Sequence, residues 1–457
     1  GLWGYIDYAV ALQLSPAAPV WFWQVSVENR SGAAFEIDLV YAQDIGLTSY
    51  AMARTNEYYV SQYVDHSPLQ HERHGWVIAS RQNLATGGRN PWCVTGSLCK
   101  GAGFATDALQ IHALSARVPR SPPVFVEELP SQRLQHEHSM VAIQDDRVRL
   151  RPGVVVTRGF FGLFNSNHPD ATSDDDLTAV DQAVSLSEAA PAHVSASDEP
   201  QQESALRTWF TTAPVLDAMP LEPDQLRALF PGEWRHRHAE SGHLLSFFYG
   251  DNRHVVLREK EMRVMRPHGH LLRTGTRATP DESALTSTVW MNGVFHSMLT
   301  QGHVSINRLL STVRSYIGLF RSHGQRMFVD WGGGWQLLGV PSAFEMSPAA
   351  CRWIYRHAQG LIEVRSEARS EPHELVLAVD VKEGHPARCM IVHHIAINGD
   401  DGAGAGTLVW SRESERIRIS PAPGSDLAKR FPDGCFEIEA AHGTVLEQVS
   451  GDDLLFV

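Results

Sequence analysis

Hydrophobic and polar residues alternate with a period of two along most of the chain, which is the pattern of half-buried β-strands. In "WFWQVSVENRSGAAFEIDLVYAQDI", residues 21–45, two runs of aromatic and β-branched residues flank a polar Asn29–Gly32 turn, and this predicts a β-hairpin. The strands "GWVIASRQ" and "WCVTGSL" are separated by "NLATGGRNP", whose Gly-Gly and Asn-Pro steps mark a turn. Residues 1–169 are therefore expected to form a β-sandwich.

A second series of alternating segments begins near residue 206 and continues to the end of the chain. Examples are "HLLSFFYG", "HVVLREKEMRVM", "RMFVDWGGGWQLLGV" and "CRWIYRHAQGLIEVRSEAR". One exception is a helical spacing of Leu226, Leu229 and Phe230 after Pro223, which predicts a short helix. The pattern as a whole predicts an all-β fold of two large antiparallel β-sandwich domains, the second covering residues 206–457.

The segment between the two series, residues 170–205, is acidic, rich in Ser and Ala, and nearly free of aromatic residues. Ser173 precedes three aspartates, and an N-cap acceptor followed by negative charge favours a helix start. We expect a short helix over about 174–188 and then a mobile stretch, because such a composition buries little apolar surface. The segment is interpreted as an acidic linker.

Composition narrows the class of protein. A length of 457 residues fits two domains, and the net charge of -13 argues against a nucleic-acid binder, which concentrates Lys and Arg on one face. No apolar run is long enough to span a membrane, so no membrane partner is expected. Five cysteines without a CxxC pair indicate reduced thiols in a cytoplasmic protein. Because no initiator Met or basic-then-apolar leader is present, Gly1 is expected to be an interior residue of a longer chain.

The histidine-rich and acidic motifs do not assemble a catalytic or metal site by spacing. His236 and His238 share one side of a strand, but no third ligand follows at a defined spacing. Glycosidases use a pair of carboxylates, and the sequence places no second carboxylate beside Glu137 in "QHEHS". Charge alternation on a half-exposed strand accounts for the same residues. No GxSxG elbow, P-loop or dinucleotide-binding glycine motif is present. We predict no catalytic residue, no metal and no cofactor.

Aromatic and planar polar residues favour contact with a neutral carbohydrate. Trp331 and Trp335 flank three glycines, and an indole stacks on the apolar face of a pyranose, although a core pair at a strand turn gives the same pattern. The loop 80–92 and the tyrosine-rich stretch 53–72 add polar candidates, with a purely structural role as the alternative. The candidate substrate-binding residues are Asn56, Arg81, Asn83, Trp92, Trp331 and Trp335.

Several blocks of the chain resemble a known family. "VWFWQVSVENRSG", "NEYYVSQYVDHSPLQH", "ASRQNLATGGRNPW", "FATDALQ" and "VPSAFEMSPAACRWIY" are similar to the amino-terminal half of glycoside hydrolase family 94 phosphorylases, in particular the 1,2-β-oligoglucan phosphorylases. The resemblance implies a super-β-sandwich domain over 206–457 and a truncated inserted sandwich over 1–169. Near residue 301 the family pattern Gly-Asn-Thr-Ser is replaced by Gly302, His303, Val304 and Ser305.

The resemblance also implies an (α/α)6 barrel that carries the catalytic acid and binds inorganic phosphate, the co-substrate of the complete enzyme. This sequence has no run of twelve alternating helices, so no catalytic residue is carried over. We expect the non-catalytic, carbohydrate-recognising half of an enzyme that converts β-1,2-glucooligosaccharides to α-glucose 1-phosphate, with the missing catalytic domain as partner. The alternatives are a free-standing carbohydrate-binding protein and a mutarotase-like epimerase, which requires a His and a Glu on one concave sheet face.

Overall fold

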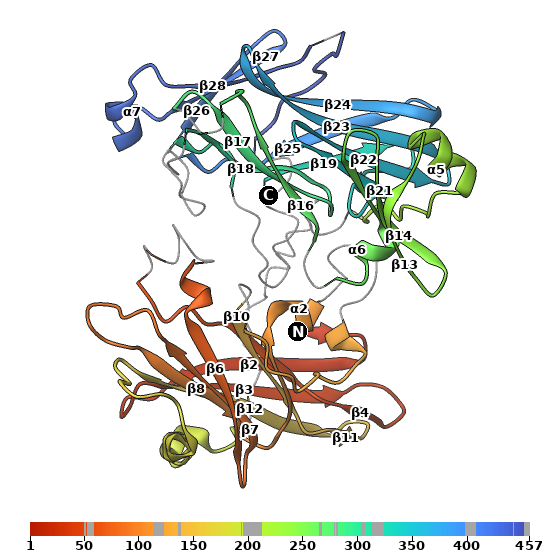
Figure 1. Cartoon of the computed structure of the whole chain (residues 1–457). Coiled ribbons are helices and arrows are strands. Elements are labelled where there is room, and N and C mark those ends of the chain that lie inside the picture. The colour runs from red at the N-terminus through yellow and green to blue at the C-terminus, as the bar shows by residue number, and fades with distance from the viewer. Residues whose placement is uncertain are drawn as a thin grey trace. The chain divides into compact units, whose positions relative to one another are not determined.

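The computed structural model describes most of the chain, and its described residues form two compact units (Figure 1). The first unit is built from described residues up to 194 and the second from residues 213 onward. Antiparallel strands dominate both, which confirms the all-β prediction. The described residues are 1–49, 52, 59–112, 123–135, 139–192, 194, 213–264, 267–277, 279, 282–302, 307–311, 324–397, 408–441 and 443–451.

The first unit is organised around one ten-stranded sheet in the order β1-β2-β3-β12-β8-β7-β9-β10-β5, with β6 paired to β7. A separate small sheet joins β4 to β11. The strands are β1 (Leu2–Trp3), β2 (Ile6–Leu14), β3 (Val20–Asn29), β4 (Phe35–Ile37), β5 (Val40–Asp44), β6 (Val64–His71), β7 (Gly75–Gln82), β8 (Trp92–Ser97), β9 (Gly101–Asp107), β10 (Ser139–Asp145), β11 (Val148–Leu150) and β12 (Val155–Asn165).

The hairpin predicted over residues 21–45 is wrong in its pairing, although its strands exist. Strand β3 lies between β2 and β12 along most of its length, while β5 pairs with β10. The reason is that β2 and β12 are long strands that occupy both edges of β3, so no edge remains for β5. The turn between β7 and β8 does form the expected antiparallel pair, with Arg81 opposite Trp92.

Both faces of this sheet bury side chains, because successive residues of a strand point to opposite faces. Phe161 and Val77 belong to the core on one face, and Phe160 and Ile78 to the core on the other. The first face is covered by helix α3 (Leu177–Val184), and the second is enclosed by the bend of the sheet itself.

The acidic segment contributes to the first unit rather than standing apart from it. Val180 and Ala183 of α3 are fully buried against β-sheet residues, and the Gln24 side chain donates hydrogen bonds to the carbonyls of Glu188 and Ala190 at 3.1 and 3.3 Å. An apolar helix face therefore anchors residues 177–190, despite the aspartates around it. The stretch after the helix, up to residue 205, was expected to be mobile; residues 193 and 195–205 of it lie outside the described residues.

The second unit contains a seven-stranded sheet, β13-β14-β15-β21-β22-β23-β24, and a six-stranded sheet, β16-β17-β18-β19-β20 with β25 paired to β19. A three-stranded sheet follows, β26-β27-β28. The strands are β13 (Arg235–Glu240), β14 (His243–Tyr249), β15 (Arg253–Leu257), β16 (Gly269–Arg273), β17 (Leu285–Trp290), β18 (Val294–Gln301), β19 (Gln325–Asp330), β20 (Gln336–Leu337), β21 (Ala343–Ser347), β22 (Ala350–His357), β23 (Gly360–Ser370), β24 (His373–Gly384), β25 (Arg388–His393), β26 (Leu408–Glu413), β27 (Arg416–Pro421) and β28 (Phe436–Glu439).

The two larger sheets of the second unit enclose one core. Phe295 and Met327 from the six-stranded sheet pack with Trp353 and Val364 from the seven-stranded sheet. The Trp353 ring is fully buried, and its Nε1–H donates to the carbonyl oxygen of Trp290 at 3.0 Å across the interface. This is a closed sandwich.

Two helices flank the seven-stranded sheet. The predicted helix is present as α5 (Pro223–Leu229), whereas the strand expected over 254–265 ends early and becomes helix α6 (Arg258–Glu261). No helix within the described residues is long and apolar enough to cross a membrane.

Candidate functional site

The loop 80–92 in the first unit is held by its own polar side chains. Arg81 donates from Nε to the carbonyl of His168 at 2.8 Å, from Nη2 to the carbonyl of Pro169 at 2.7 Å, and from Nη1 to the Asn83 side chain. The backbone N–H of Asn83 donates to the Tyr63 carbonyl at 2.9 Å. The Arg81 guanidinium is therefore engaged in fixing the segment that follows β12.

Trp92 does not fulfil the expectation of an exposed stacking ring. Its side chain is 1% exposed, stacks on the His168 ring at 5.2 Å, and donates from Nε1 to the Thr172 hydroxyl at 3.1 Å. The physical reason is that residues 166–172 fold across the loop and cover the indole. Trp92 packs in the core between the sheet and α3, so its indole face is not exposed to a ligand.

The glycine turn after β19 has a defined conformation. The Asp330 carboxylate accepts hydrogen bonds from the N–H groups of Gly332 and Gly334 at 2.7 and 2.9 Å. Both glycines have positive φ angles, +94° and +103°, which a side chain would disfavour. The turn is thus organised by Asp330 and does not swing freely.

The two indoles that flank this turn do not form one platform. Trp331 packs on the core between the two large sheets and lies 4.1 Å from the His357 ring. Trp335 packs on a different cluster with Phe328, and the Arg388 guanidinium lies 5.6 Å from its ring centroid. Met327 and Val329 belong to the core that Trp331 contacts, whereas Phe328 belongs to the cluster that Trp335 contacts. Because successive strand residues point to opposite faces, the two indoles pack on opposite faces of β19.

The tyrosine-rich stretch is described only in part. Asn56 and Glu137 lie outside the described residues, as does the segment that contains His303, Val304 and Ser305. Within the described part, the Tyr59 and Tyr63 rings meet edge to face at 5.0 Å and are partly exposed.

Two buried histidines, one in each unit, each bridge two serine hydroxyls. His66 contacts the Oγ atoms of Ser80 and Ser139 at 2.8 and 2.6 Å, and burial lowers its pKa to about 4. His296 contacts Ser287 and Ser366 at 3.0 and 2.8 Å, and burial lowers its pKa to about 3.

Both rings are neutral at physiological pH and satisfy buried hydroxyls, so their role is to hold strands together. Sequence reasoning missed both bridges. The signal would have been strand register, because Ser80 lies directly opposite His66 on the neighbouring strand.

The epimerase alternative requires a His and a Glu close together on a sheet face, and the second unit contains one close His–Glu pair. The His268 Nδ1 lies 2.6 Å from the fully buried Glu261 carboxylate, which also accepts the backbone N–H of His268 at 3.0 Å. Both contacts close the short loop between α6 and β16.

In the part of the chain that the structure describes, no group of three His, Cys, Asp or Glu side chains could hold a metal ion.

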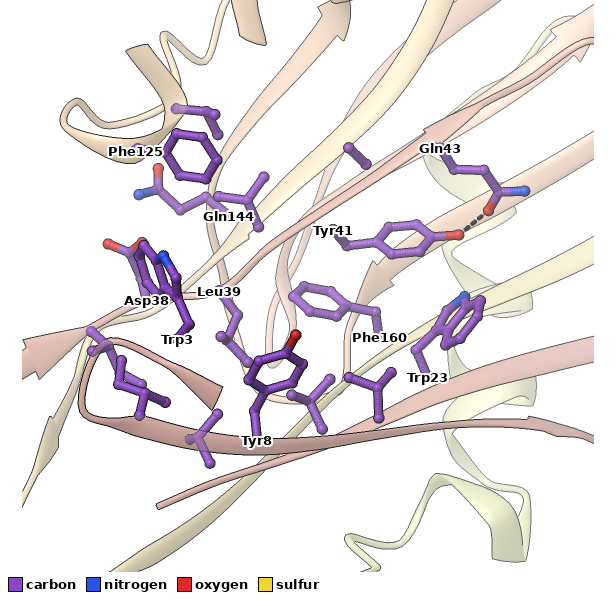
Figure 2. A pocket seen from close by; sticks show the side chains of 18 of the residues that line it. Trp3, Tyr8, Trp23, Asp38, Leu39, Tyr41, Gln43, Phe125, Gln144 and Phe160 are labelled. Atoms are coloured by element: carbon purple, nitrogen blue, oxygen red, sulfur yellow. Dashed lines mark hydrogen bonds between the residues drawn. The ribbon is translucent and has the colours of Figure 1, made fainter. Parts of the chain in front are cut away.

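The first unit contains a groove of about 1350 Å³ (Figure 2). Strands β1, β2 and β3 line one wall, with Trp3 and Tyr8, and strands β4 and β5 together with residues 124–127 line the other, with Tyr41 and Phe125. The Trp3 and Phe125 rings lie 6.3 Å apart. Sequence reasoning missed this groove.

Polar groups in the groove are mostly bonded to each other. The Trp21 Nε1–H donates to the Tyr41 hydroxyl at 3.3 Å, and that hydroxyl donates to Gln43, as the dashed line in Figure 2 shows. Burial raises the pKa of Tyr41 to about 12, so it stays protonated. Arg147 contacts the Asp38 carboxylate at 3.6 Å. The groove is therefore lined mainly by apolar and aromatic side chains, and the carboxylates of Glu36 and Glu127 also belong to its lining.

Comparisons with known proteins match both units to described domains. Residues 1–162 match the SOGP N-terminal domain, and residues 230–456 match the glycoside phosphorylase supersandwich domain. A 1,2-beta-oligoglucan phosphorylase from Listeria innocua serovar 6a (strain ATCC BAA-680 / CLIP 11262) is 26% identical over 452 residues, which is 98% of this chain. The chain spans 39% of the length of that relative.

Solved structures give weaker similarities. A protein described as a kojibiose phosphorylase from human microbiome has 13% identity and a TM-score of 0.25, covering 40% of this chain and 19% of its own. A polysaccharide lyase has 7% identity and a TM-score of 0.24, covering 83% of this chain and 34% of its own. From the two domain matches, the chain carries an SOGP N-terminal domain followed by a glycoside phosphorylase supersandwich domain.

Proposed function

We propose that this chain is the non-catalytic, carbohydrate-recognising and scaffolding part of a β-1,2-oligoglucan phosphorylase. The observation that carries the proposal is the match over 98% of the chain to a 1,2-beta-oligoglucan phosphorylase, supported by two domain matches in series. In the complete enzyme, inorganic phosphate would take the glucosyl group and release α-glucose 1-phosphate. Under this proposal the chain binds glucooligosaccharides in the cytoplasm, and a catalytic domain performs the reaction.

Two buried acidic side chains, Asp145 and Glu345, have surroundings that support a non-catalytic role. Burial raises the pKa of Asp145 to about 6, a value suited to a general acid. However, Asp145 is only 1% exposed, accepts a hydrogen bond from Ser97 Oγ at 2.8 Å, and lies 3.6 Å from Arg158 Nε. A carboxyl group in this position cannot reach a substrate oxygen.

Glu345 in the second unit is similarly committed. It is 4% exposed, accepts from the Tyr249 hydroxyl at 2.7 Å, and pairs with Arg352 at 3.1 Å. These partners fix the carboxylate between neighbouring strands. Its geometry is that of a structural ion pair rather than a proton donor to a leaving group.

Carbohydrate contact by Asn56, Asn83, Trp331 and Trp335 belongs to this proposal. Trp335 is the candidate with the most suitable surroundings, because its half-buried ring lies beside the exposed Arg388 guanidinium, which uses Nη2 to bind the Glu447 carboxylate at 3.0 Å and has further N–H donors. Arg81 is a weaker candidate, since its guanidinium already bonds two carbonyls.

A phosphorolysis assay tests the non-catalytic part of the proposal. The purified chain is incubated with β-1,2-glucooligosaccharides and inorganic phosphate, and glucose 1-phosphate is measured, with the complete Listeria relative as positive control. We expect no release above background from this chain. Sustained release at a rate proportional to its concentration would overturn the proposal.

A further inference from the structure

The central strands β3 and β12 supply part of the groove lining in the first unit. Their contribution is Trp21 and Trp23 from β3 and Phe160 from β12. Strand β3 pairs with β2 and β12, and β12 pairs with β3 and β8, so both strands have a partner on each edge. This part of the groove is therefore fixed within the sheet, whatever pairs with the outer edge of β2.

Aromatic rings are spread along the groove (Figure 2). The labelled rings that line it are Trp3, Tyr8, Trp23, Tyr41, Phe125 and Phe160. The Tyr41 and Phe160 rings stack at 5.4 Å, and the Phe125 side chain is 65% exposed. An aromatic ring can stack on the apolar C–H face of a pyranose. Rings from several strands of one groove therefore suit a ligand made of successive sugar units.

Two side-chain amides among these rings have donors to offer. The Gln43 Oε1 accepts from the Tyr41 hydroxyl, and the Gln144 Oε1 accepts from the backbone N–H of Leu129 at 2.8 Å. Each amide is thus held through its oxygen, and neither Nε2 group has a partner among the described residues. An NH₂ group of this kind donates hydrogen bonds, which sugar hydroxyl oxygens accept.

Two carboxylates in the lining restrict the chemistry of the occupant. Glu36 and Glu127 are exposed, and neither forms an ion pair within the described part of the chain. An acyl chain or an apolar peptide seated here would bury these charges without partners, which is costly. An anionic ligand would be repelled. An uncharged ligand rich in hydroxyl groups avoids both costs, because its O–H groups donate to the carboxylates.

We propose that this groove is the oligosaccharide-binding site of the chain, with Phe125 and neighbouring rings stacking on sugar units and Gln43 donating to their hydroxyl oxygens. The inference rests on the proposed function, which supplies β-1,2-glucooligosaccharides as the ligand, and it assigns recognition to the first unit rather than to Trp335. The groove volume of about 1350 Å³ exceeds the roughly 1,000 Å³ of large small-molecule pockets, so it has room for several sugar units.

Calorimetric titration of the full chain with β-1,2-glucooligosaccharides tests the proposal through variants. Phe125→Ala removes an exposed ring and should raise Kd about tenfold without lowering the thermal unfolding temperature. Gln43→Ala removes an amide donor and should also raise Kd. Phe125→Tyr is the matched control, because it keeps a stacking ring and should bind like the unmodified chain. Trp335→Ala in the second unit should leave Kd unchanged.

Hydrogen exchange of the unmodified chain locates the ligand independently of any variant. Saturating oligosaccharide should slow exchange in β5 and in residues 123–127, and not in residues 331–336. Binding that persists in Phe125→Ala and Gln43→Ala but is lost in Trp335→Ala, with protection at residues 331–336, would overturn the groove as the site and leave the proposed function standing. Absence of any binding by the unmodified chain would overturn both.

Discussion

Strands with the same alternating pattern bury their apolar side chains to different extents in the two units. In the second unit, Trp353 lies between two facing sheets and is fully buried. In the first unit, Val10 and Leu12 occupy equivalent alternate positions on β2, yet about half of each side chain is exposed. The second unit buries its apolar strand faces between two sheets, whereas the first bends one sheet around a groove and leaves one edge apolar.

The difference arises from what covers each sheet. Helix α3 covers one face of the ten-stranded sheet with Val180 and Ala183, and the bend of the sheet must bury the other face. In the second unit, the facing six-stranded sheet covers one side, and Phe230 after helix α5 packs with Phe247 on the other. Alternation thus indicates a strand, while the availability of a facing layer decides whether its apolar side is closed.

The largest expected effect tests whether the core of the second unit is closed between its two large sheets. Trp353→Ala removes a fully buried ring and should lower the free energy of unfolding by about 3–5 kcal/mol. Trp410→Ala is the control, because this ring is 47% exposed and its loss should cost about 0.5 kcal/mol or less.

Hydrogen exchange on the intact chain locates the Trp353 effect. Faster exchange should appear in β18, β19, β22 and β23 and not in the first unit. Equal acceleration in both units would show that they unfold as one body, and the comparison between them would lose its basis.

The next largest effect concerns the buried histidines, which the two units share. His66 has a pKa of about 4 when folded and 6.5 as the reference, so between these values the unfolded chain binds a proton that the folded chain does not. The free energy of unfolding should therefore fall as the pH drops from about 6.5 to about 4, by up to about 3 kcal/mol from His66 alone. Above pH 6.5 this contribution is fully present.

Urea unfolding across this pH range measures the effect in the His66→Gln variant. Asp145 has the opposite effect, because its raised pKa makes the folded chain bind an extra proton between about pH 4 and 6. The comparison is therefore between variants, in the slope of unfolding free energy against pH. His66→Gln should flatten the acid slope, and the exposed His385→Gln should not. An unchanged slope for His66→Gln would contradict a buried neutral imidazole.

A smaller effect tests whether α3 closes one face of the first unit. Val180→Ala removes two methyl groups from a fully buried position and should cost about 2 kcal/mol. Asp175→Ala, an exposed change just before the helix, is the control. Limited proteolysis should cut residues 174–190 faster in Val180→Ala, and equal cleavage of both variants would mean that α3 does not stabilise the sheet.

The smallest effect separates structure from sugar contact in the loop of the first unit. Arg81→Ala removes hydrogen bonds to His168 and Pro169 and should cost about 1 kcal/mol, while the exposed Arg89→Ala should be nearly neutral. Calorimetry with β-1,2-glucooligosaccharides should show the same affinity for Arg81→Ala as for the unmodified chain. Weakened binding with unchanged stability would show that Arg81 contacts the sugar and does not act only as a structural residue.

Much of the fold follows from local pattern, but strand pairing does not. Period-two alternation predicts β3, β7, β8 and β14, and helical spacing predicts α5. The partner of β3 depends on β12, more than a hundred residues away, and no local signal distinguishes it from the nearby β5. The Asn29–Gly32 turn composition therefore suggested a hairpin that long-range pairing overrides.

The candidate site was harder to predict because residue type does not determine exposure. Trp92 and Trp335 look alike in the sequence, yet Trp92 is covered by residues 166–172, whereas Trp335 is half-buried in its own unit. Arg81 looks like a surface contact, but its partners are carbonyls far along the chain. The groove was missed for the same reason, since its walls come from strands that are adjacent only in the folded unit.

Isothermal titration calorimetry of the full chain with β-1,2-glucooligosaccharides tests the central proposal of carbohydrate recognition most directly. Cellooligosaccharides of equal length are the control, since they differ only in linkage. The account predicts saturable binding of the β-1,2-linked ligand and at least tenfold weaker binding of the β-1,4-linked one. Absence of heat up to millimolar ligand, or equal affinity for both linkages, would contradict it.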